Sequence, residues 1–318
     1  MRKAILASIC CALLAAGAQA QQYPNKAIKL LVPAGAGSAS DAIGRLFAQR
    51  FGEVIGQVIV VDNRAGAGGR LGPAIAAKAP PDGYTLFLGN SIGLGTLVTT
   101  AANLEYDPVT DFIPISPVAS YQNILVCNPN VPVRTMAELI AYAKKRPNAI
   151  RFSTAGLGSG NHFAVELLNW KAGVQTQHVP YRTNALGMQE VIAGQIECTI
   201  ESTAGPYIAA GQLRALGVTS LKRNPRLPDV PTLDEQGVKG YDLWWWHALL
   251  VPAKTPAPIV ETIRAAAVKV TSDTAWKQRV YAAGFDPREG TPQDLAAMIK
   301  FEIERYRSIA KAANLKFD

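Results

Sequence analysis

Residues 34–41 have the composition of an anion-binding loop. They follow an apolar, strand-like run, contain only small residues and Asp41, and lead into a helix-like pattern over residues 41–54. Small residues let backbone N–H groups approach a ligand, and the first N–H groups of a helix have no partner within the helix. A carboxylate would be held well at such a point. The candidate ligand-binding residues of this loop are Ala34, Gly35, Gly37, Ser38, Ser40 and Asp41.

Asp41 has two roles open to it in this loop. It could cap the N-terminus of the following helix, or it could accept a hydrogen bond from a ligand amide, a hydroxyl or a bridging water. Its charge would repel an anion placed directly against it. The sequence does not decide between these roles.

A second segment, residues 154–162, repeats the pattern in the other half of the chain. The strand-like run 150–156 overlaps "TAGLGSGNH", and a helix-like pattern follows from about Asn161. Two strand–loop–helix units of this kind could face each other across a cleft that closes by hinge motion. The candidate ligand-binding residues here are Thr154, Gly156, Gly158, Ser159 and His162.

Further polar residues follow strand-like runs, at the ends where α/β sheets place ligand contacts. Arg182 could pair with a carboxylate through two parallel hydrogen bonds, or it could lie solvated at the surface. Core or hinge packing explains the run Trp244–Trp246 better than a stacking platform does. The candidates of this group are Asn90, Ser91, Tyr181, Arg182, Thr183, Glu201 and Ser202.

The spacing of these residues disfavours several kinds of catalytic or cofactor site. The dinucleotide fingerprint G-x-G-x-x-G lacks its third glycine because Ser40 stands there, although Asp62 keeps a nicotinamide site open as an alternative. No nucleotide P-loop run occurs, and Ser159 lacks the flanking glycines of a hydrolase elbow. His162 and Glu166 have helical spacing but no third metal ligand near them. These patterns therefore favour a binding site over a catalytic site or a metal site.

Strand-like and helix-like runs alternate through most of the chain, which predicts α/β layers with largely parallel sheets. The rhythm starts again after residues 106–119, so the chain builds this kind of layer twice. The tail from residue 256 is nearly all helical and is expected to pack on the first layer. The expected strands are 27–34, 57–63, 85–90, 123–129, 150–156, 176–181, 196–202 and 213–219, and the expected helices are 41–54, 71–79, 135–145, 161–173, 185–195 and 205–212.

The expected organisation is two domains with a ligand cleft between them. Residues 21–124 and 250–318 would form domain 1, and residues 125–249 would form domain 2. The chain would cross between them near Gln122 to Cys127 and again near Trp246 to Pro252. About 298 residues remain after a leader of 20 is removed from the 318, which is enough for two domains of ordinary size.

Residues 1–20 have the layout of a cleaved secretory signal. Basic Arg2 and Lys3 precede an apolar run, and a small-residue site ends at Ala20. We therefore expect a signal peptide and a mature chain outside the cytoplasm that begins near Gln21. The formal charge of +8 falls to about +6 without Arg2 and Lys3, since 30 basic residues then face 24 acidic ones. These basic residues are scattered, which disfavours nucleic acid as a partner.

Cys127 and Cys198 are the two cysteines that remain after the leader is removed. Both stand in strand-like runs. One disulfide between them is compatible with an oxidising compartment, but two separate buried thiols are the preferred interpretation.

Eight segments, in order along the chain, match one known family far more specifically than a glycine loop does. They are "YPNKAIKLLVPAGAGSASD", "VIVVDNRAGAGGRLG", "PPDGYTLFLGN", "YDPVTDFIPISPVA", "STAGLGSGNH", "HVPYR", "GQLRALGVTSLKRNPRLPDVPTLDEQG" and "LLVPAKTPAPIV". On these segments the chain resembles the Bug family, also called the TctC family, which comprises the periplasmic receptors of tripartite tricarboxylate transporters.

The resemblance implies a type II two-domain periplasmic-binding-protein fold, each domain a mainly parallel sheet flanked by helices, joined by two crossing strands. It implies no catalytic step and no cofactor. A ligand carboxylate would be gripped between residues 34–41 and 154–162, often through ordered water.

The chain departs from the family pattern at residues that would line the pocket. Ala34 stands where a bulkier aromatic is usual, Thr183 where glycine is usual, and Glu201 and Ser202 where an Asp is common. We therefore expect the loops that grip a carboxylate to be retained and the pocket that selects the rest of the ligand to be altered.

The sequence favours a monomeric periplasmic receptor that binds a small organic carboxylate and passes it to membrane transporter subunits or a sensor protein. One alternative is an extracytoplasmic sensor partner without a transport role. Another is an enzyme on a similar scaffold, either a hydrolase or a nucleotide-dependent oxidoreductase. The identity of the acid is left open.

Overall fold

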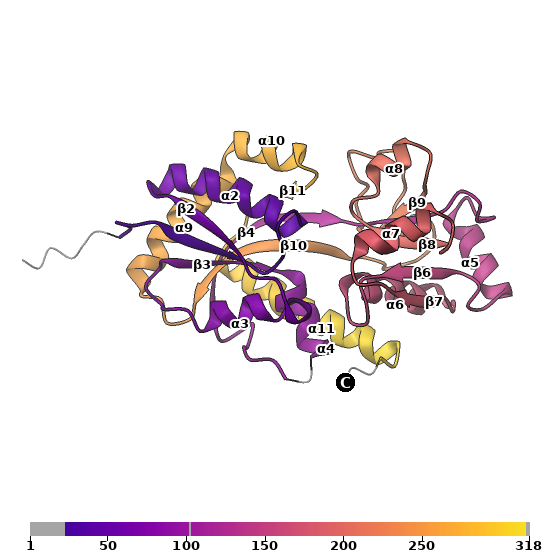
Figure 1. Cartoon of the computed structure of the whole chain (residues 1–318), viewed down its shortest axis with the longest axis horizontal. Helices are drawn as coiled ribbons and strands as arrows, with labels where there is room; N and C mark the ends of the chain where they lie inside the picture. Colours follow the sequence, from indigo (N-terminus) through magenta and orange to yellow (C-terminus); the bar gives the residue numbers. More distant parts are fainter. Residues whose placement is uncertain (1–22, 102, 316–318) are drawn as a thin grey trace, which may run out of the picture.

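A computed structural model of the chain describes residues 23–101 and 103–315, so the expected signal peptide lies outside the described residues. Two lobes, each built on one β-sheet, lie side by side (Figure 1). The sheet of the first lobe has six strands in the order β11-β4-β10-β3-β1-β2. These strands are β1 (Ile28–Val32), β2 (Ile59–Asn63), β3 (Thr85–Asn90), β4 (Phe112–Gln122), β10 (Trp244–Pro252) and β11 (Asp286–Pro287).

Helices cover both faces of this sheet because apolar side chains alternate between them. On β1, Leu30 and Val32 join one buried cluster, and Leu31 between them joins another on the opposite face. The first cluster includes residues of α2 (Ala39–Ile55), α9 (Ala257–Ser272) and α10 (Thr274–Ala282). The second cluster involves residues of α3 (Leu71–Ala77), which follows η1 (Ala67–Gly69), and of η2 (Ile92–Thr96), α4 (Leu97–Thr100) and α11 (Pro292–Ala312).

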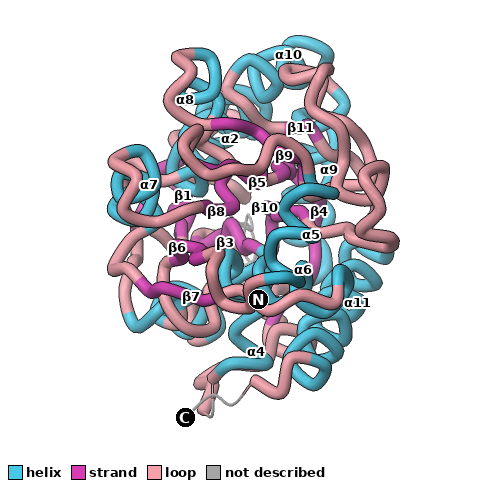
Figure 2. The backbone as a smooth tube through the Cα atoms, turned by 90° about the vertical axis from the view of Figure 1, so that its right-hand side faces the viewer, coloured by secondary structure: helices cyan, strands magenta, loops and turns pink. Residues whose placement is uncertain are grey.

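The second lobe has five strands in the order β7-β6-β8-β5-β9. In the end-on view of Figure 2, helices and loops surround the strands. The strands are β5 (Ile124–Cys127), β6 (Arg151–Thr154), β7 (Gln177–Pro180), β8 (Cys198–Glu201) and β9 (Arg214–Val218), and the helices are α5 (Met136–Lys145), α6 (Gly160–Ala172), α7 (Asn184–Ile192) and α8 (Gly205–Ala209).

The predicted α/β fold with two lobes is confirmed, and every expected strand and helix is present. Both sheets are mixed, however, against the expectation of mainly parallel pairing: β1 pairs parallel with β2 and β3, but β10 runs antiparallel to β3 and β5 runs antiparallel to β8. The strands that carry the chain between lobes explain this. β5 enters the second lobe at the edge where β8 ends, and β10 enters the first lobe at the edge where β3 ends, so each runs antiparallel to that strand.

The hinge between the lobes consists of two crossing segments that are hydrogen-bonded through Thr219. The N–H of Asn123 donates to Thr219 Oγ1 at 3.0 Å, and the N–H of Thr219 donates back to the Asn123 carbonyl at 3.0 Å. The N–H of Leu243 donates to the Thr219 carbonyl at 2.8 Å. Outgoing and returning chains therefore lie side by side.

The chain returns to the first lobe earlier in the sequence than the expected domain boundary at residue 250. All of β10 pairs with β4, from Trp244 opposite Gln122 to Pro252 opposite Phe112, so an expected boundary at residue 250 falls inside a strand of the first sheet. The run is apolar on both sides of His247, so its pattern does not mark where the chain changes lobes. The residue ranges of the two domains stay a prediction.

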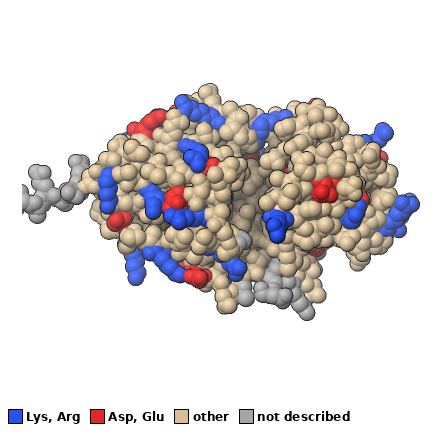
Figure 3. Space-filling view, in the orientation of Figure 1, with Lys and Arg blue, Asp and Glu red and all other residues tan. Residues whose placement is uncertain are grey.

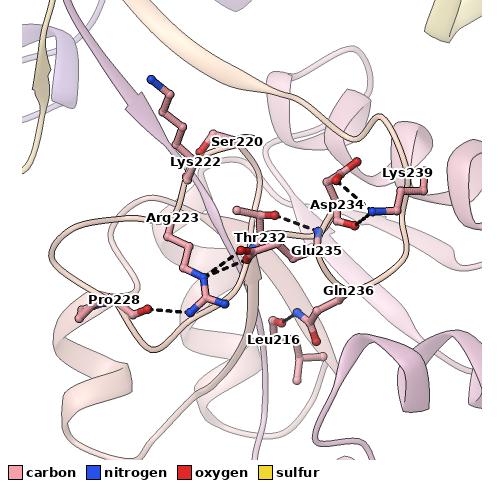
Figure 4. A network of polar contacts seen from close by, with 10 residues as sticks. All are labelled: Leu216, Ser220, Lys222, Arg223, Pro228, Thr232, Asp234, Glu235, Gln236 and Lys239. Carbon is pink, nitrogen blue, oxygen red and sulfur yellow. Dashed lines mark hydrogen bonds and ion pairs between the residues drawn. The ribbon is translucent and has the colours of Figure 1, made fainter.

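The long connection between β9 and β10, residues 219–243, is held by polar contacts of its own (Figure 4). Arg223 Nε donates to Glu235 Oε2 at 2.9 Å, and Arg223 Nη1 donates to the Pro228 carbonyl at 3.1 Å. Lys239 Nζ donates to Asp234 Oδ2 at 3.2 Å. These bonds replace the regular secondary structure that a connection of this length lacks.

Arg226, in the same connection, reaches the first lobe. Its Nη2 donates to the Gly284 carbonyl at 2.7 Å, and its guanidinium carbon lies 5.0 Å from the centre of the Tyr281 ring. The two lobes therefore also touch at the end of α10.

The C-terminal tail packs on both lobes, where the sequence predicted packing on the first alone. Helices α9 and α10 cover the first sheet as expected. On α11, however, Tyr306 packs edge-on against Phe163 of α6 with ring centres 5.0 Å apart, and Ile309 and Ala310 join the core of the second lobe. With 21 residues, α11 is about 31 Å long and extends past the first lobe.

Cys127 and Cys198 form a disulfide, so the preferred expectation of two separate thiols was wrong. The two residues are 71 positions apart in sequence but are direct partners in the register of β5 and β8. Spacing along the chain carries no information about this pairing.

We expect the disulfide to stabilise the second lobe because it closes a loop of about 70 residues in the unfolded chain. The double variant Cys127→Ala with Cys198→Ala should lose about 2–4 kcal/mol of unfolding free energy. Urea unfolding with and without dithiothreitol measures this, and the reductant should affect only the wild type. Equal wild-type stability in both buffers would contradict the expectation.

Candidate ligand-binding site

The first cradle, residues 34–41, ends at the N-terminus of α2 and is closed by reciprocal hydrogen bonds. Ser38 is the N-cap, and its Oγ accepts the N–H of Asp41 at 3.2 Å. Asp41 Oδ2 in turn accepts the N–H of Gly37 at 2.9 Å, and the N–H of Ser38 donates to the Gly35 carbonyl at 3.3 Å. Gly37 has a φ of +80°, which glycine adopts without strain.

The second cradle, residues 154–162, repeats these bonds at the N-terminus of α6. Ser159 Oγ accepts the N–H of His162 at 3.2 Å, and His162 Nδ1 accepts the N–H of Gly158 at 3.0 Å. The N–H of Ser159 donates to the Gly156 carbonyl at 3.2 Å. The repeat seen in the sequence thus extends to individual hydrogen bonds, with His162 in the place of Asp41.

Each cradle leaves two N–H donors at the start of its helix. In the described part of the chain, no hydrogen bond uses the N–H of Ala39 or Ser40 in the first cradle, or of Gly160 or Asn161 in the second. These groups lie at the positive end of a helix dipole, which attracts anions. Each cradle can therefore offer paired donors and a partial positive charge to a carboxylate.

The capping role that the sequence left open for Asp41 is present in the structure. Arg45, one helical turn further on, lies 3.0 Å from Asp41 Oδ1. The hydrogen bond from Arg45 is the main reason that the pKa of Asp41 is lowered, and the N–H of Gly37 acts in the same direction. Asp41 is therefore ionised with its charge offset by Arg45. A direct contact between Asp41 and a ligand stays a prediction.

Both cradles approach the same face of β10. Trp245 and His247 are two residues apart on this strand, so their side chains project from one face. Ser40 Oγ lies 2.8 Å from His247 Nε2, and a Cβ atom added to Gly160 would lie 2.4 Å from Trp245 Nε1. Tyr121 on β4 stacks on both rings, with centre distances of 6.0 Å and 5.8 Å. We call Tyr121, Trp245 and His247 the platform.

The platform sets the separation of the cradles. Two residues along a strand span about 7 Å, so the starts of α2 and α6 converge over a distance that one small molecule can bridge. The space-filling view is hollowed between the two lobes (Figure 3).

Asn90 lies beside the first cradle, at the end of β3. It is opposite His247 in the strand register, and its Nδ2 donates to Ser40 Oγ at 3.4 Å. Its Oδ1 accepts the N–H of Gly93 at 2.8 Å. The next residue, Ser91, is buried, and its Oγ has no hydrogen-bond partner among the described residues. The structure thus joins Asn90 to the first cradle and places Ser91 next to it in the chain.

Sequence reasoning missed two platform residues, Tyr121 and His247. His247 stands in the run "WWWHALLVP", whose residues after Trp244 are all buried, so no alternation marks one face of the strand. The one available signal was a lone polar residue in an apolar strand. Burial lowers the pKa of His247 to about 3, so its imidazole is neutral at physiological pH.

Thr154 and His162 meet a second histidine at the far side of the second cradle. Thr154 Oγ1 lies 2.5 Å from His178 Nε2, and the rings of His162 and His178 stack with centres 4.2 Å apart. Burial, with a smaller effect of His178, lowers the pKa of His162 to about 4. His162 Nε2 lies 3.6 Å from Glu166 Oε1. Because Nδ1 of His162 accepts the backbone N–H of Gly158, this histidine helps to fix the conformation of the loop.

Glu201 occupies the position at the second cradle that Asn90 occupies at the first, at the end of a central strand. It is buried, and its Oε1 accepts Asn161 Nδ2 at 2.9 Å. Burial raises the pKa of Glu201 to about 8, against opposing hydrogen bonds from Ser202 and Asn161. Glu201 therefore holds its proton near neutral pH and can act as a hydrogen-bond donor.

The remaining predicted residues lie around the second cradle with less direct contacts. The N–H of Tyr181 donates to the Thr154 carbonyl at 2.9 Å, and Arg182 is exposed. Thr183 is the N-cap of α7 and accepts the N–H of Leu186 at 3.3 Å, which gives it a local role. Ser202 is half-buried. Ligand contacts by these four residues stay predictions.

A cavity of about 700 Å³ lies apart from the cradles, on the first lobe between α3 and the edge of the sheet. Lys29, Arg64 and Lys78 line it, but each is paired with Asp62 or Glu105. None of the predicted site residues lines this cavity. On the face seen in Figure 3, basic side chains are dispersed over both lobes. In the residues that the structure describes, no helix combines the length and apolar character needed to span a membrane.

Comparison with known proteins points to one family. Residues 43–315 match the family described as tripartite tricarboxylate transporter family receptor. The chain is 35% identical to a UPF0065 protein from the tcbD-tcbE intergenic region of Pseudomonas sp. (strain P51), covering 97% of this chain and 93% of that protein.

Solved structures give the same result. Rpa4515 of R. palustris, solved with adipate, is 33% identical with a TM-score of 0.83, covering 92% of this chain and 98% of that one. MatC of Rhodopseudomonas palustris, solved with bound malate, is 28% identical with a TM-score of 0.79, covering 90% of this chain and 99% of that one.

We expect Gly160→Ala to disturb the platform because the added Cβ would overlap Trp245, which is itself buried. Overpacking of this kind lowers the unfolding free energy by about 1–3 kcal/mol. Urea unfolding and tryptophan fluorescence measure the effect. Gly205→Ala is the matched control, since Gly205 also begins a helix but has no atom within 4 Å of an added Cβ. Equal losses in the two variants would contradict the expected contact.

We expect Glu201 to make stability depend on pH in a way that glutamine removes. Its pKa is about 8 in the folded chain against an ordinary 4.5, so its stabilising contribution is full below pH 4.5 and is lost as the pH rises through 8. The unfolding free energy of Glu201→Gln minus that of the wild type should therefore increase from pH 4.5 to 8.5. A constant difference over this range would show that the pKa is not raised.

Proposed function

The chain belongs to the tripartite tricarboxylate transporter receptor family, and we propose that it captures one small organic carboxylate between its two lobes. It would then pass this acid to membrane transporter subunits or to a sensor protein in the periplasm. Relatives solved with adipate and with malate support a carboxylate as the ligand class.

One observation carries the proposal: two helix N-termini from different lobes meet one face of β10. Ser40 contacts His247, and Gly160 lies against Trp245 two residues away. Two pairs of N–H donors then converge on the space above the platform. A single anion shared by both pairs would favour approach of the lobes, because each lobe gains hydrogen bonds from it.

Neutral donors and helix dipoles would hold the acid. Arg45 is the one Lys or Arg side chain that bonds a cradle residue in the described part of the chain, and its partner Asp41 already offsets its charge. His162 and His247 are neutral at physiological pH. Recognition by fixed dipoles depends on the placement of the backbone, which the repeated caps provide.

A hydrolase is the alternative with a specific feature in its favour, since Ser40 and His247 stand 2.8 Å apart as a nucleophile and base would. A pKa of about 3 makes His247 a weak base at neutral pH, however, and its Nδ1 has no carboxylate partner among the described residues. Binding without chemistry is therefore better supported.

Ala39→Pro tests the first cradle by deleting one N–H group. Proline is favoured at the first position of a helix, and Ser38 before it has the extended conformation, φ −76° and ψ 166°, that a following proline requires. Isothermal titration with adipate, malate, succinate and citrate should show a loss of affinity of at least about tenfold for the acid that binds.

Thr274→Pro is the matched control, because Thr274 begins α10 after an extended Asp273 and lies outside the cradles. Its affinity should equal that of the wild type. If the wild type bound no acid of this panel at millimolar concentration, the proposed function would fail. Unchanged affinity in Ala39→Pro would remove the first cradle from the site.

A further inference from the structure

His247 is placed to control the hydroxyl group of Ser40. Only 1% of the residue is exposed, and its ring lies between Tyr121, with centres 5.8 Å apart, and Phe285, at 6.2 Å. Its Nε2 lies 2.8 Å from Ser40 Oγ, and its Nδ1 is buried with no hydrogen-bond partner among the described residues. The ring therefore makes one polar contact, to a residue of the first cradle.

The position of the ring proton decides what Ser40 can do. With the proton on Nδ1, the Ser40 hydroxyl would donate to Nε2, and the Nδ1–H would be a buried donor with no acceptor. With the proton on Nε2, the ring would donate to Ser40 Oγ, which also receives Asn90 Nδ2 at 3.4 Å. The hydroxyl proton of Ser40 is then left for another acceptor. A buried donor without a partner is costly, which favours the second arrangement.

We propose that His247 is a positioning residue for ligand binding, which carries its proton on Nε2, donates to Ser40 Oγ and so directs the Ser40 hydroxyl toward an oxygen of a bound carboxylate. This inference rests on the proposed function. The first cradle then presents three donors, the N–H groups of Ala39 and Ser40 and the hydroxyl of Ser40. These three donors can bind an anionic oxygen, which accepts hydrogen bonds, and they disfavour a ligand group that can only donate.

The environment keeps this arrangement fixed across physiological pH. Aromatic rings cover the imidazole, and burial lowers its pKa to about 3, so the ring stays neutral and keeps one donor and one acceptor nitrogen. Ser40 is itself buried.

Nuclear magnetic resonance of the ligand-free protein tests the proton position directly. The chain has three histidines, so nitrogen-15 labelling of histidine gives few ring signals, and loss of one set in His247→Gln assigns it. His247 should show protonated Nε2 and unprotonated Nδ1 from pH 5 to 8. A proton on Nδ1 would overturn the inference, whatever the ligand is.

Affinity for adipate and malate tests the consequence for binding. The side-chain amide of glutamine can replace Nε2 of a histidine, and that of asparagine can replace Nδ1. His247→Gln should therefore bind within about threefold of the wild type, whereas His247→Asn and Ser40→Ala should each bind about tenfold more weakly. Adding His247→Asn to Ser40→Ala should weaken binding no further, because both act through one hydroxyl.

Two results would contradict the role of His247. One is equal loss in the glutamine and asparagine variants, and the other is additive loss in the double variant. Thermal unfolding of each variant separates loss of fold from loss of binding. If the wild type bound neither acid, the proposed function would be in question, and the proton position in the ligand-free protein would decide the inference alone.

Discussion

The backbone N–H groups that begin α2 and α6 are the constraint on which the rest of the site depends. A helix cannot provide acceptors for these groups itself. In each cradle a serine cap accepts one of them, and the side chain of Asp41 or His162 accepts the N–H of a glycine in the loop. The bonds leave the first two N–H groups of each helix unused and hold them in fixed positions. Gly37, Gly156 and Gly158 in these loops have positive φ, which glycine adopts without strain.

The direction of the crossing strands brings the two cradles together. Parallel strands place their C-terminal ends, and so the cradles, at the inner edge of each sheet. A chain that enters a lobe at this edge must run antiparallel to those strands, as β5 and β10 do, which makes both sheets mixed. The returning strand β10 then passes beneath both cradles and supplies Trp245 and His247. The strand that connects the lobes therefore also carries two of the three platform residues.

The sequence was sufficient for features that depend on local pattern. Expected strands and helices were found because alternation and caps act over a few residues, and the cradles were identified from small residues before a helix. The sequence was insufficient for contacts between segments that are far apart in the chain. The disulfide of Cys127 with Cys198 depends on register, and the packing of α11 on both lobes depends on where β10 re-enters. His247 was missed because its partner Ser40 is 207 residues away in the sequence. Thr183 was predicted as a ligand contact, but its hydroxyl caps the helix that follows it.

The placement of α11 on both lobes has a mechanical consequence. This helix holds the lobes together on one side of the molecule, while α8 and α10 lie on the opposite side (Figure 1). Any rotation of one lobe relative to the other is therefore centred near α11 and the strands beside it, and displacement grows with distance from that axis. Arg226 bonds the chain after α10, on the side opposite α11, so such a rotation would have to stretch or break its contacts with the first lobe.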